Sequence, residues 1–288
     1  MTTKKKATKA AKKRSSLATL SIATSQKKPA PARVAALAAA PLAATESDQN
    51  LQKVLGVLQN QDEPVEVRLA AMDSLAAAAF SVVAFESSRP DYIAALRKVS
   101  TDPNPEIRQR ALSTLAGEKD GFAQKKLLEG LKNPDKALVP PEKALQLLSY
   151  DVHAEAYEVA RKIVKDPPNE AAKQEGLRLL AGDAKSASMF EKLLRDKDEL
   201  REVRQLSASA LQALKPDKLQ EHAREMLLDK SEFEDIQATS LTALKQFGDD
   251  ENVSKDKALL ASVDRLSTKA ASSRYKKSAR QFLTKFKG

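Results

Sequence analysis

Apolar residues recur along the chain with the spacing of one face of an α-helix. In the stretch from Asp102 to Leu115, the residues Ile107, Ala111, Leu112 and Leu115 occupy positions i−4, i, i+1 and i+4. Residues three or four apart share a helix face, so these side chains form one stripe. A small residue at position i lets a neighbouring helix approach closely. The stretch therefore predicts a turn followed by a packed helix.

The same stripe occurs seven times, with 30 to 40 residues between successive copies. The small position is occupied by Ala71, Ala111, Ala144, Gly176, Ala210, Ser240 and Ala279. Other apolar stripes lie between these copies, at 51–58, 92–99, 122–131, 156–164, 189–194, 219–228 and 258–266. Each repeat is then a helix A, a short turn and a helix B. A period of this length is typical of a helical solenoid.

Two copies carry a more specific motif. Pro64-Val65-Glu66-Val67-Arg68 leads to Ala71, and Pro105-Glu106-Ile107-Arg108 leads to Ala111. This motif resembles the second helix of a HEAT repeat, and the short repeat length is similar to the HEAT-like repeats named after phycobilisome lyases. The resemblance covers about residues 46–288. It implies an all-α, right-handed α-solenoid of about seven HEAT-like helix pairs, in which the B helices line the concave side.

The net positive charge of the chain comes from its N-terminal part. Residues 1–45 contain ten basic residues and no acid, and the first acid is Glu46. Removing these ten from the 49 basic residues leaves 39, which equals the number of acidic residues. We therefore expect two regions: a disordered Lys/Ala-rich basic tail at 1–45, with too little apolar mass for a core, and a neutral HEAT-like repeat domain at 46–288.

Three interpretations of the tail remain open. It is a solubilising arm, a segment that contacts nucleic acid or another polyanion through counterion release, or an organelle-targeting segment. The residues expected to contact a polyanion are Lys4, Lys5, Lys6, Lys9, Lys12, Lys13 and Arg14.

The first B helix is expected to continue through an apolar run from Leu75 to Phe85. This run is too short to span a membrane. Either residues 34–44 or the next repeat cover it, or it is a docking surface for a partner or a second copy. Pro140 and Pro141 predict a shortened third B helix, and the segment from Gly248 to Asp256 is expected to be an exposed loop.

The composition excludes most kinds of catalytic and metal-binding chemistry. The chain has no Cys, two His and only eight Gly, which excludes thiolate chemistry, cysteine zinc sites and a Gly-rich phosphate loop. His153 and His222 lie in different repeats and neither has metal-ligand spacing. We therefore expect that the chain is not an enzyme and has no catalytic, cofactor-binding or metal-binding residues.

The polar positions beside the stripes remain as candidates for binding. If the B helices line a concave face, basic side chains there form a groove for an acidic peptide or protein surface. The candidates are Arg68, Arg108, Arg110, Lys143, Lys173, Arg178, Arg204 and Lys276, mixed with Gln109, Gln146, Gln174, Gln205 and Gln212. The competing interpretation is an ordinary solvated helix face.

The leading hypothesis is a non-enzymatic protein-interaction scaffold that binds a partner on the concave helix-B face. A nucleic-acid-associated protein that uses its tail without sequence specificity is the first alternative, and a lyase or chaperone-type HEAT protein is the second. The expected partners are proteins, acidic ones included, with non-specific nucleic acid through the tail and no membrane. The expected location is the cytoplasm, with an organelle, the nucleoid or the nucleus as alternatives.

Overall fold

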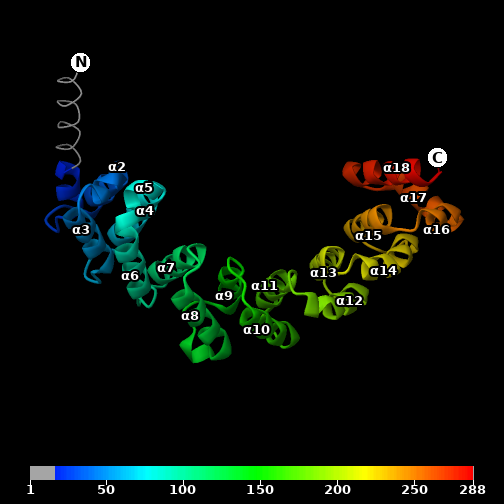
Figure 1. The fold of residues 1–288 in the computed structure, drawn as a ribbon, viewed down its shortest axis with the longest axis horizontal. Coiled ribbons are helices and arrows are strands. Elements are labelled where there is room, and N and C mark those ends of the chain that lie inside the picture. The colour runs from blue at the N-terminus through cyan, green and yellow to red at the C-terminus, as the bar shows by residue number, and fades with distance from the viewer. Residues whose placement is uncertain (1–16, 288) are drawn as a thin grey trace, which may run out of the picture. The chain divides into compact units, whose positions relative to one another are not determined.

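The structure is a computed structural model that describes residues 17–287. Within this range the chain is α-helical with short 3-10 segments (Figure 1). Its packing divides it into two compact units, Met1–Pro140 and Pro141–Gly288. The all-α solenoid class of HEAT-like helix pairs, predicted from the stripes, is confirmed within each unit.

The first unit begins with a helical segment at residues 17–23 and continues as a run of helices. These are α2 (Ala30–Ala39), η1 (Pro41–Glu46), α3 (Asp48–Gln59), α4 (Val65–Ala79), α5 (Val82–Phe85), η2 (Glu86–Ser88), α6 (Arg89–Val99), α7 (Pro105–Gly117), α8 (Gly121–Lys132) and η3 (Pro134–Lys136). Helix α3 packs on α4 and α6 packs on α7, as expected for A and B helices of one repeat.

The second unit has the same construction. Its helices are α9 (Pro141–Leu148), α10 (Ala154–Lys165), α11 (Glu170–Leu180), η4 (Ala184–Ser186), α12 (Ala187–Arg195), α13 (Arg201–Leu214), α14 (Pro216–Leu228), α15 (Glu234–Phe247), α16 (Asp250–Lys255), α17 (Lys257–Lys269) and α18 (Ser273–Lys287). The A–B pairs are α10 with α11, α12 with α13, α14 with α15 and α17 with α18. The third expected repeat is divided, since α8 belongs to the first unit and α9 to the second. As Pro140 and Pro141 predicted, α9 has only eight residues.

Turn residues start these helices by accepting backbone hydrogen bonds. The Asn104 side chain accepts from the N–H groups of Glu106 and Ile107 at the start of α7, and Pro105 occupies its first turn. Such side chains satisfy donors that have no partner inside the helix. Such caps fix where α7 and α11 begin, whereas α4, α13 and α15 start without a side-chain cap.

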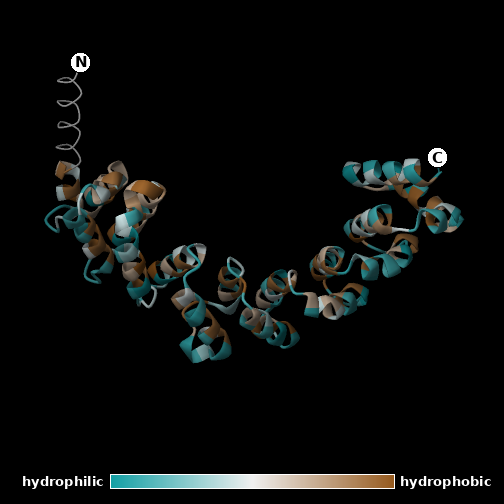
Figure 2. Cartoon of the chain, in the orientation of Figure 1, coloured by the Kyte–Doolittle hydropathy of each residue, from teal (hydrophilic) through white to brown (hydrophobic). Residues whose placement is uncertain are grey.

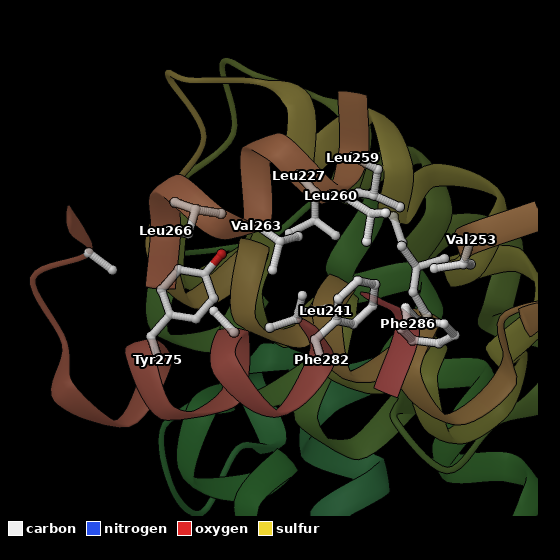
Figure 3. Packing of buried hydrophobic residues seen from close by; sticks show 14 residues of the cluster. Leu227, Leu241, Val253, Leu259, Leu260, Val263, Leu266, Tyr275, Phe282 and Phe286 are labelled. Carbon is white, nitrogen blue, oxygen red and sulfur yellow. The ribbon is translucent and has the colours of Figure 1, made fainter. Parts of the chain in front are cut away.

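The predicted stripes form the cores of the units. At the small position of the fourth stripe, a Cβ on Gly176 would lie 2.8 Å from Val164 Cγ2 of the paired helix α10. Only glycine fits so close a helix contact without a shift of the neighbour. At the end of the chain, α18 turns Tyr275, Phe282 and Phe286 onto α15 and α17 (Figure 3).

A buried arginine links successive repeats in both units. Arg68 of α4 donates from Nε to Leu58 O, 2.9 Å away in the last turn of α3, and its guanidinium pairs with Asp102 in the turn of the next repeat. Arg204 of α13 repeats this geometry, with Leu194 O at 3.0 Å and Glu232 at 2.6 Å. We call this arrangement the arginine bridge. It gives a partner to a carbonyl at a helix end and neutralises a buried carboxylate.

The arginine bridge also occurs upstream of the expected repeat domain. Arg33 of α2 donates to Ala23 O at 3.0 Å and pairs with Glu63 in the turn between α3 and α4. The side chains of Arg33 and Glu63 are only 3% and 4% exposed. The expected tail at 1–45 was therefore wrong for its described part, because residues 17–39 form a further helix pair. Residues 1–16 lie outside the described residues.

Two other local expectations were wrong. Helix α4 does not continue to Phe85: it ends at Ala79, and the following helical segment turns by 119°. Helices α2 and η1 cover part of α4, as one of the two interpretations held, but Phe80, Val82 and Val83 stay exposed. The segment expected as a loop after Gly248 contains the short helix α16, which Asp249 caps.

We expect Arg204→Met to destabilise the second unit by about 3 kcal/mol or more, because it leaves the Glu232 carboxylate buried without its main partner. Arg201→Met is the matched control: Arg201 lies on the same helix, and its pair with Asp235 is half exposed. That control should cost about 1 kcal/mol or less. Urea unfolding followed by circular dichroism measures both, and equal effects would contradict the bridge.

The bridge also predicts how stability depends on pH. Burial of Glu232 opposes its ionisation, but hydrogen bonds from Arg204 and Lys197 outweigh burial and lower its pKa below the usual 4.5. A carboxyl with a lowered pKa stabilises the fold above its unfolded pKa, and this contribution is lost as the pH falls through the folded value. The unfolding temperature should therefore be steady down to about pH 5 and fall below about pH 4.5. In Glu232→Gln the acid-side decline should be shallower, and an unchanged decline would contradict the assignment.

Candidate functional site

The structure removes most of the predicted basic B-face residues from the set of free binding groups. Arg68 and Arg204 are buried in arginine bridges, each with 2% of its surface exposed, so neither can contact a partner. Arg108 is half buried and donates to the carbonyls of Leu138 at 2.6 Å and Asp102 at 2.7 Å. These arginines serve the fold because their side chains complete the hydrogen bonding of turns.

The remaining predicted residues are more accessible, but most are paired. Three form ion pairs: Lys173 with Glu199, Arg178 with Glu175, and Arg110 with Asp73. Lys143 donates a hydrogen bond to Gln146, and Lys276 is half buried on α18. The predicted tail residues from Lys4 to Arg14 lie outside the described residues. The predicted basic groove is therefore not a row of unpaired cations.

A hollow does lie on B helices of the second unit, across α13, α15 and α18. We call it the B-face groove, and its volume is about 450 Å³. Helix α15 packs against both α13 and α18, so the groove follows three successive B helices. Its walls are mostly polar, formed by Arg201, Gln205, Gln212, Glu234, Asp235, Ala238, Thr239, Thr242, Ser272, Arg274, Tyr275 and Ser278.

One acceptor in the B-face groove has no partner. Gln205 donates from Nε2 to Thr239 Oγ1 at 3.1 Å, which holds its amide across from α13 to α15. Its Oε1 is buried and makes no hydrogen bond. An unsatisfied buried acceptor costs free energy, and because this oxygen is closed to solvent, a ligand N–H reaches it only when the Gln205 amide turns into the groove. This atom marks the groove as a site suited to a hydrogen-bond donor.

The charges of the groove are mixed and mostly internal. Arg201 pairs with Asp235 at 3.1 Å, and Glu234 accepts the N–H groups of Ala271 and Ser272 at 2.6 and 3.2 Å. Burial raises the pKa of Tyr275, so its hydroxyl stays neutral at physiological pH. Such a lining favours neutral polar groups such as amides over a strongly charged ligand.

Sequence reasoning found only part of this groove. It placed Gln205 and Gln212 on the B face but gave the binding role to the basic residues. It missed Thr239 and Thr242 of α15 and Arg274 of α18 as members of the groove. The spacing of 34 residues that the pairs Gln205–Thr239 and Gln212–Gln246 share is a signal that could have revealed Thr239.

A second hollow of about 700 Å³ opens between the A helices α10 and α12. Val164, Met189 and Leu193 give it an apolar floor, and Lys162, Lys165 and Lys192 stand around it. It is open to solvent, and neither of the buried polar side-chain atoms that lack a partner among the described residues lies in it. We therefore regard it as secondary to the B-face groove.

A histidine and two glutamates form one cluster with metal-ligand chemistry. Ligand atoms of Glu191, Glu221 and His222 lie within 4.8 Å of one another. His222 Nε2 is 2.7 Å from Glu191 Oε1, and Lys218 pairs with Glu221 at 2.8 Å. The hydrogen bond with His222 is the main cause of the lowered pKa of Glu191. The three residues could hold a metal ion only if these existing contacts were broken.

Comparison with known proteins adds little beyond the fold. No family model matches the chain, and no curated protein matches it. Among solved structures it is similar to human deoxyhypusine hydroxylase in complex with glycerol, at 15% identity and a TM-score of 0.37, over 86% of this chain and 99% of that one. No single helix among the described residues is long and apolar enough to cross a membrane.

The expectation that the chain is not an enzyme is corrected by these findings. The similar solved structure is that of an enzyme, and the described residues include the Glu191–Glu221–His222 cluster, which elimination by sequence spacing missed. It was missed because the three residues come from two helices, α12 and α14. At this degree of similarity no activity or substrate is carried over to this chain.

We expect equimolar Zn²⁺ to leave the unfolding temperature of the protein unchanged, because a metal must displace both the His222–Glu191 hydrogen bond and the Lys218–Glu221 pair. Differential scanning calorimetry, with and without a chelator, measures this. A metal-dependent rise that His222→Gln abolishes and His153→Gln keeps would contradict the expectation and define a metal site. His153 is the matched control because it is the chain's other histidine and is exposed.

Proposed function

We propose that the protein is a protein-interaction scaffold that binds an extended peptide segment of a partner in the B-face groove. The observation that carries this proposal is the unpartnered Gln205 Oε1 in a polar hollow that follows three successive B helices. Successive B helices present equivalent positions at a regular interval. A groove of this kind suits a ligand that is itself periodic and rich in hydrogen-bonding groups.

The chemistry of the lining supports a peptide backbone as the ligand. An extended peptide exposes N–H and C=O groups at regular intervals, and side-chain amides and hydroxyls can bond to both. Gln205, Gln212 and Thr242 provide such groups on the groove walls. Gln205 Oε1, which is closed to solvent, would accept an N–H of the bound segment once its amide turns into the groove.

The electrostatics favour a partner segment of low net charge. Arg201 and Asp235 neutralise each other, whereas Arg274 and Glu234 have no ion pair among the described residues and add one positive and one negative charge, so the lining has no net charge. A segment with a single acidic side chain near Arg274 fits this distribution. Instead of the acidic partner surface expected from the sequence, we propose a single acidic contact with the groove. We place this function in the cytoplasm, in keeping with a chain that has no Cys.

We expect Thr242→Arg to block the groove and weaken peptide binding by about tenfold or more, a loss of about 1.4 kcal/mol. The measurement is fluorescence anisotropy with peptides selected on the full chain from a random phage-displayed library. Thr284→Arg on α18 is the matched control. Both threonine hydroxyls bond to the carbonyl four residues earlier, but Thr284 lies outside the groove.

The two variants carry the same added charge and differ only in position. Equal binding by both, at the level of the parent protein, would place the selected peptides elsewhere and contradict the proposal. Loss in Thr242→Arg alone would support the groove as the binding site.

A further inference from the structure

The strongest feature that the B-face groove leaves unexplained is an apolar projection in the first unit. Between α4 and α5 the chain turns sharply, and Phe80, Val82 and Val83 are 89%, 61% and 93% exposed. We call these three residues the apolar tip. No charged residue occurs between Asp73 and Glu86. Figure 2 shows α5 as a hydrophobic segment of the first unit.

The apolar tip is held in place by a packed base. Ala78, just before it, and Phe85, just after it, are both fully buried. Phe85 packs edge-on against Tyr92 of α6, with ring centroids 5.5 Å apart. The tip is therefore not a locally unfolded part of the core. Folding has fixed its base and left three large apolar side chains in water, which costs free energy unless another surface covers them.

The basic tail starts from the same unit as the apolar tip. The helical segment at 17–23 is bonded through Ala23 O to Arg33, and Arg33 is paired with Glu63 beside the α3–α4 turn. Helix α2, which carries Arg33, packs on α4, whose end begins the tip. The sixteen residues before this segment hold seven basic residues and no acid.

We propose that the first unit binds the surface of an anionic lipid membrane, with the apolar tip entering the interfacial region and the basic tail contacting the lipid headgroups. An anionic membrane attracts basic residues through its headgroups and buries apolar side chains in its interfacial region. It therefore binds the tip and the tail together, whereas either feature alone binds weakly. A nucleic acid would use the tail but leave the tip in water. A second copy would cover the tip but be repelled by another basic tail. The inference is independent of the peptide proposal, since the B-face groove belongs to the other unit, and it departs from the expectation that no membrane takes part.

The test is sedimentation of the full chain with vesicles of phosphatidylcholine containing one third phosphatidylserine, and with pure phosphatidylcholine vesicles. Binding should require phosphatidylserine and fall steeply with salt. Phe80→Ser, Val82→Ser and Val83→Ser together should weaken it by about tenfold or more, as should replacing the seven tail cations by Gln. The matched control replaces three exposed apolar residues of the second unit, Tyr150, Leu200 and Phe247, by Ser.

Because the chain has no Trp, a single Trp reports directly on insertion. In Val83→Trp the emission should shift to the blue when anionic vesicles are added, and in Tyr150→Trp it should not. Absence of vesicle binding would overturn the proposal. So would binding that the tip variant leaves unchanged, since this is attraction of the tail alone. A tip-dependent dimer in sedimentation velocity would also overturn it and assign the tip to a second copy.

Discussion

The structure depends on one interaction, the arginine that joins a helix end to the turn of the next repeat. Arg33, Arg68 and Arg204 each donate to a carbonyl ten residues earlier and to a carboxylate in the following turn. Each is buried. A guanidinium in this position must find both partners, because an unpaired buried charge is costly. The interaction therefore fixes the distance and angle between neighbouring repeats more than it adds net stability, which comes from the apolar stripes.

Where the arginine is absent, other groups perform part of its task. Lys173 keeps the link to the next turn through Glu199 but has no carbonyl partner given by the structure. Gln237 bonds to neighbouring carbonyls at the same helix end, with Nε2 at 2.9 Å from Asp229 O and 3.4 Å from Met226 O, and accepts the Tyr275 hydroxyl in place of a carboxylate. A second set of bridges runs along the A helices, from Arg97 to Asp120 and from Arg224 to Asp256. Most charged side chains near the turns are thus used within the fold, and the B-face groove has amides and hydroxyls beside two residues of each charge sign.

The stripes in the sequence predicted the fold class and almost every A and B helix, because burial of one helix face is a local pattern. Arg33 shows a feature that the local pattern did not predict. Its bridge has the same spacing as that of Arg68, yet Lys-rich neighbours led to a prediction of disorder. Phe80 shows the opposite case, since an apolar run predicted a continuous helix and Ser81 gave no strong reason for the break. The binding role of Arg68 and Arg204 was wrong for a physical reason: charge in the sequence does not say whether a side chain points to water or to a carbonyl.

The candidate groove was only partly predictable for the same reason. Gln205 and Gln212 lie at positions that the stripes place on the B face, but the unpartnered Oε1 of Gln205 results from contacts across three helices. The most direct test of the account is a double-mutant cycle on the Arg68–Asp102 bridge, with Arg68→Met, Asp102→Asn and the double variant unfolded in urea. The account predicts that the two losses are not additive, with a coupling free energy of about 1–3 kcal/mol. Additive losses, with a coupling near zero, would contradict it.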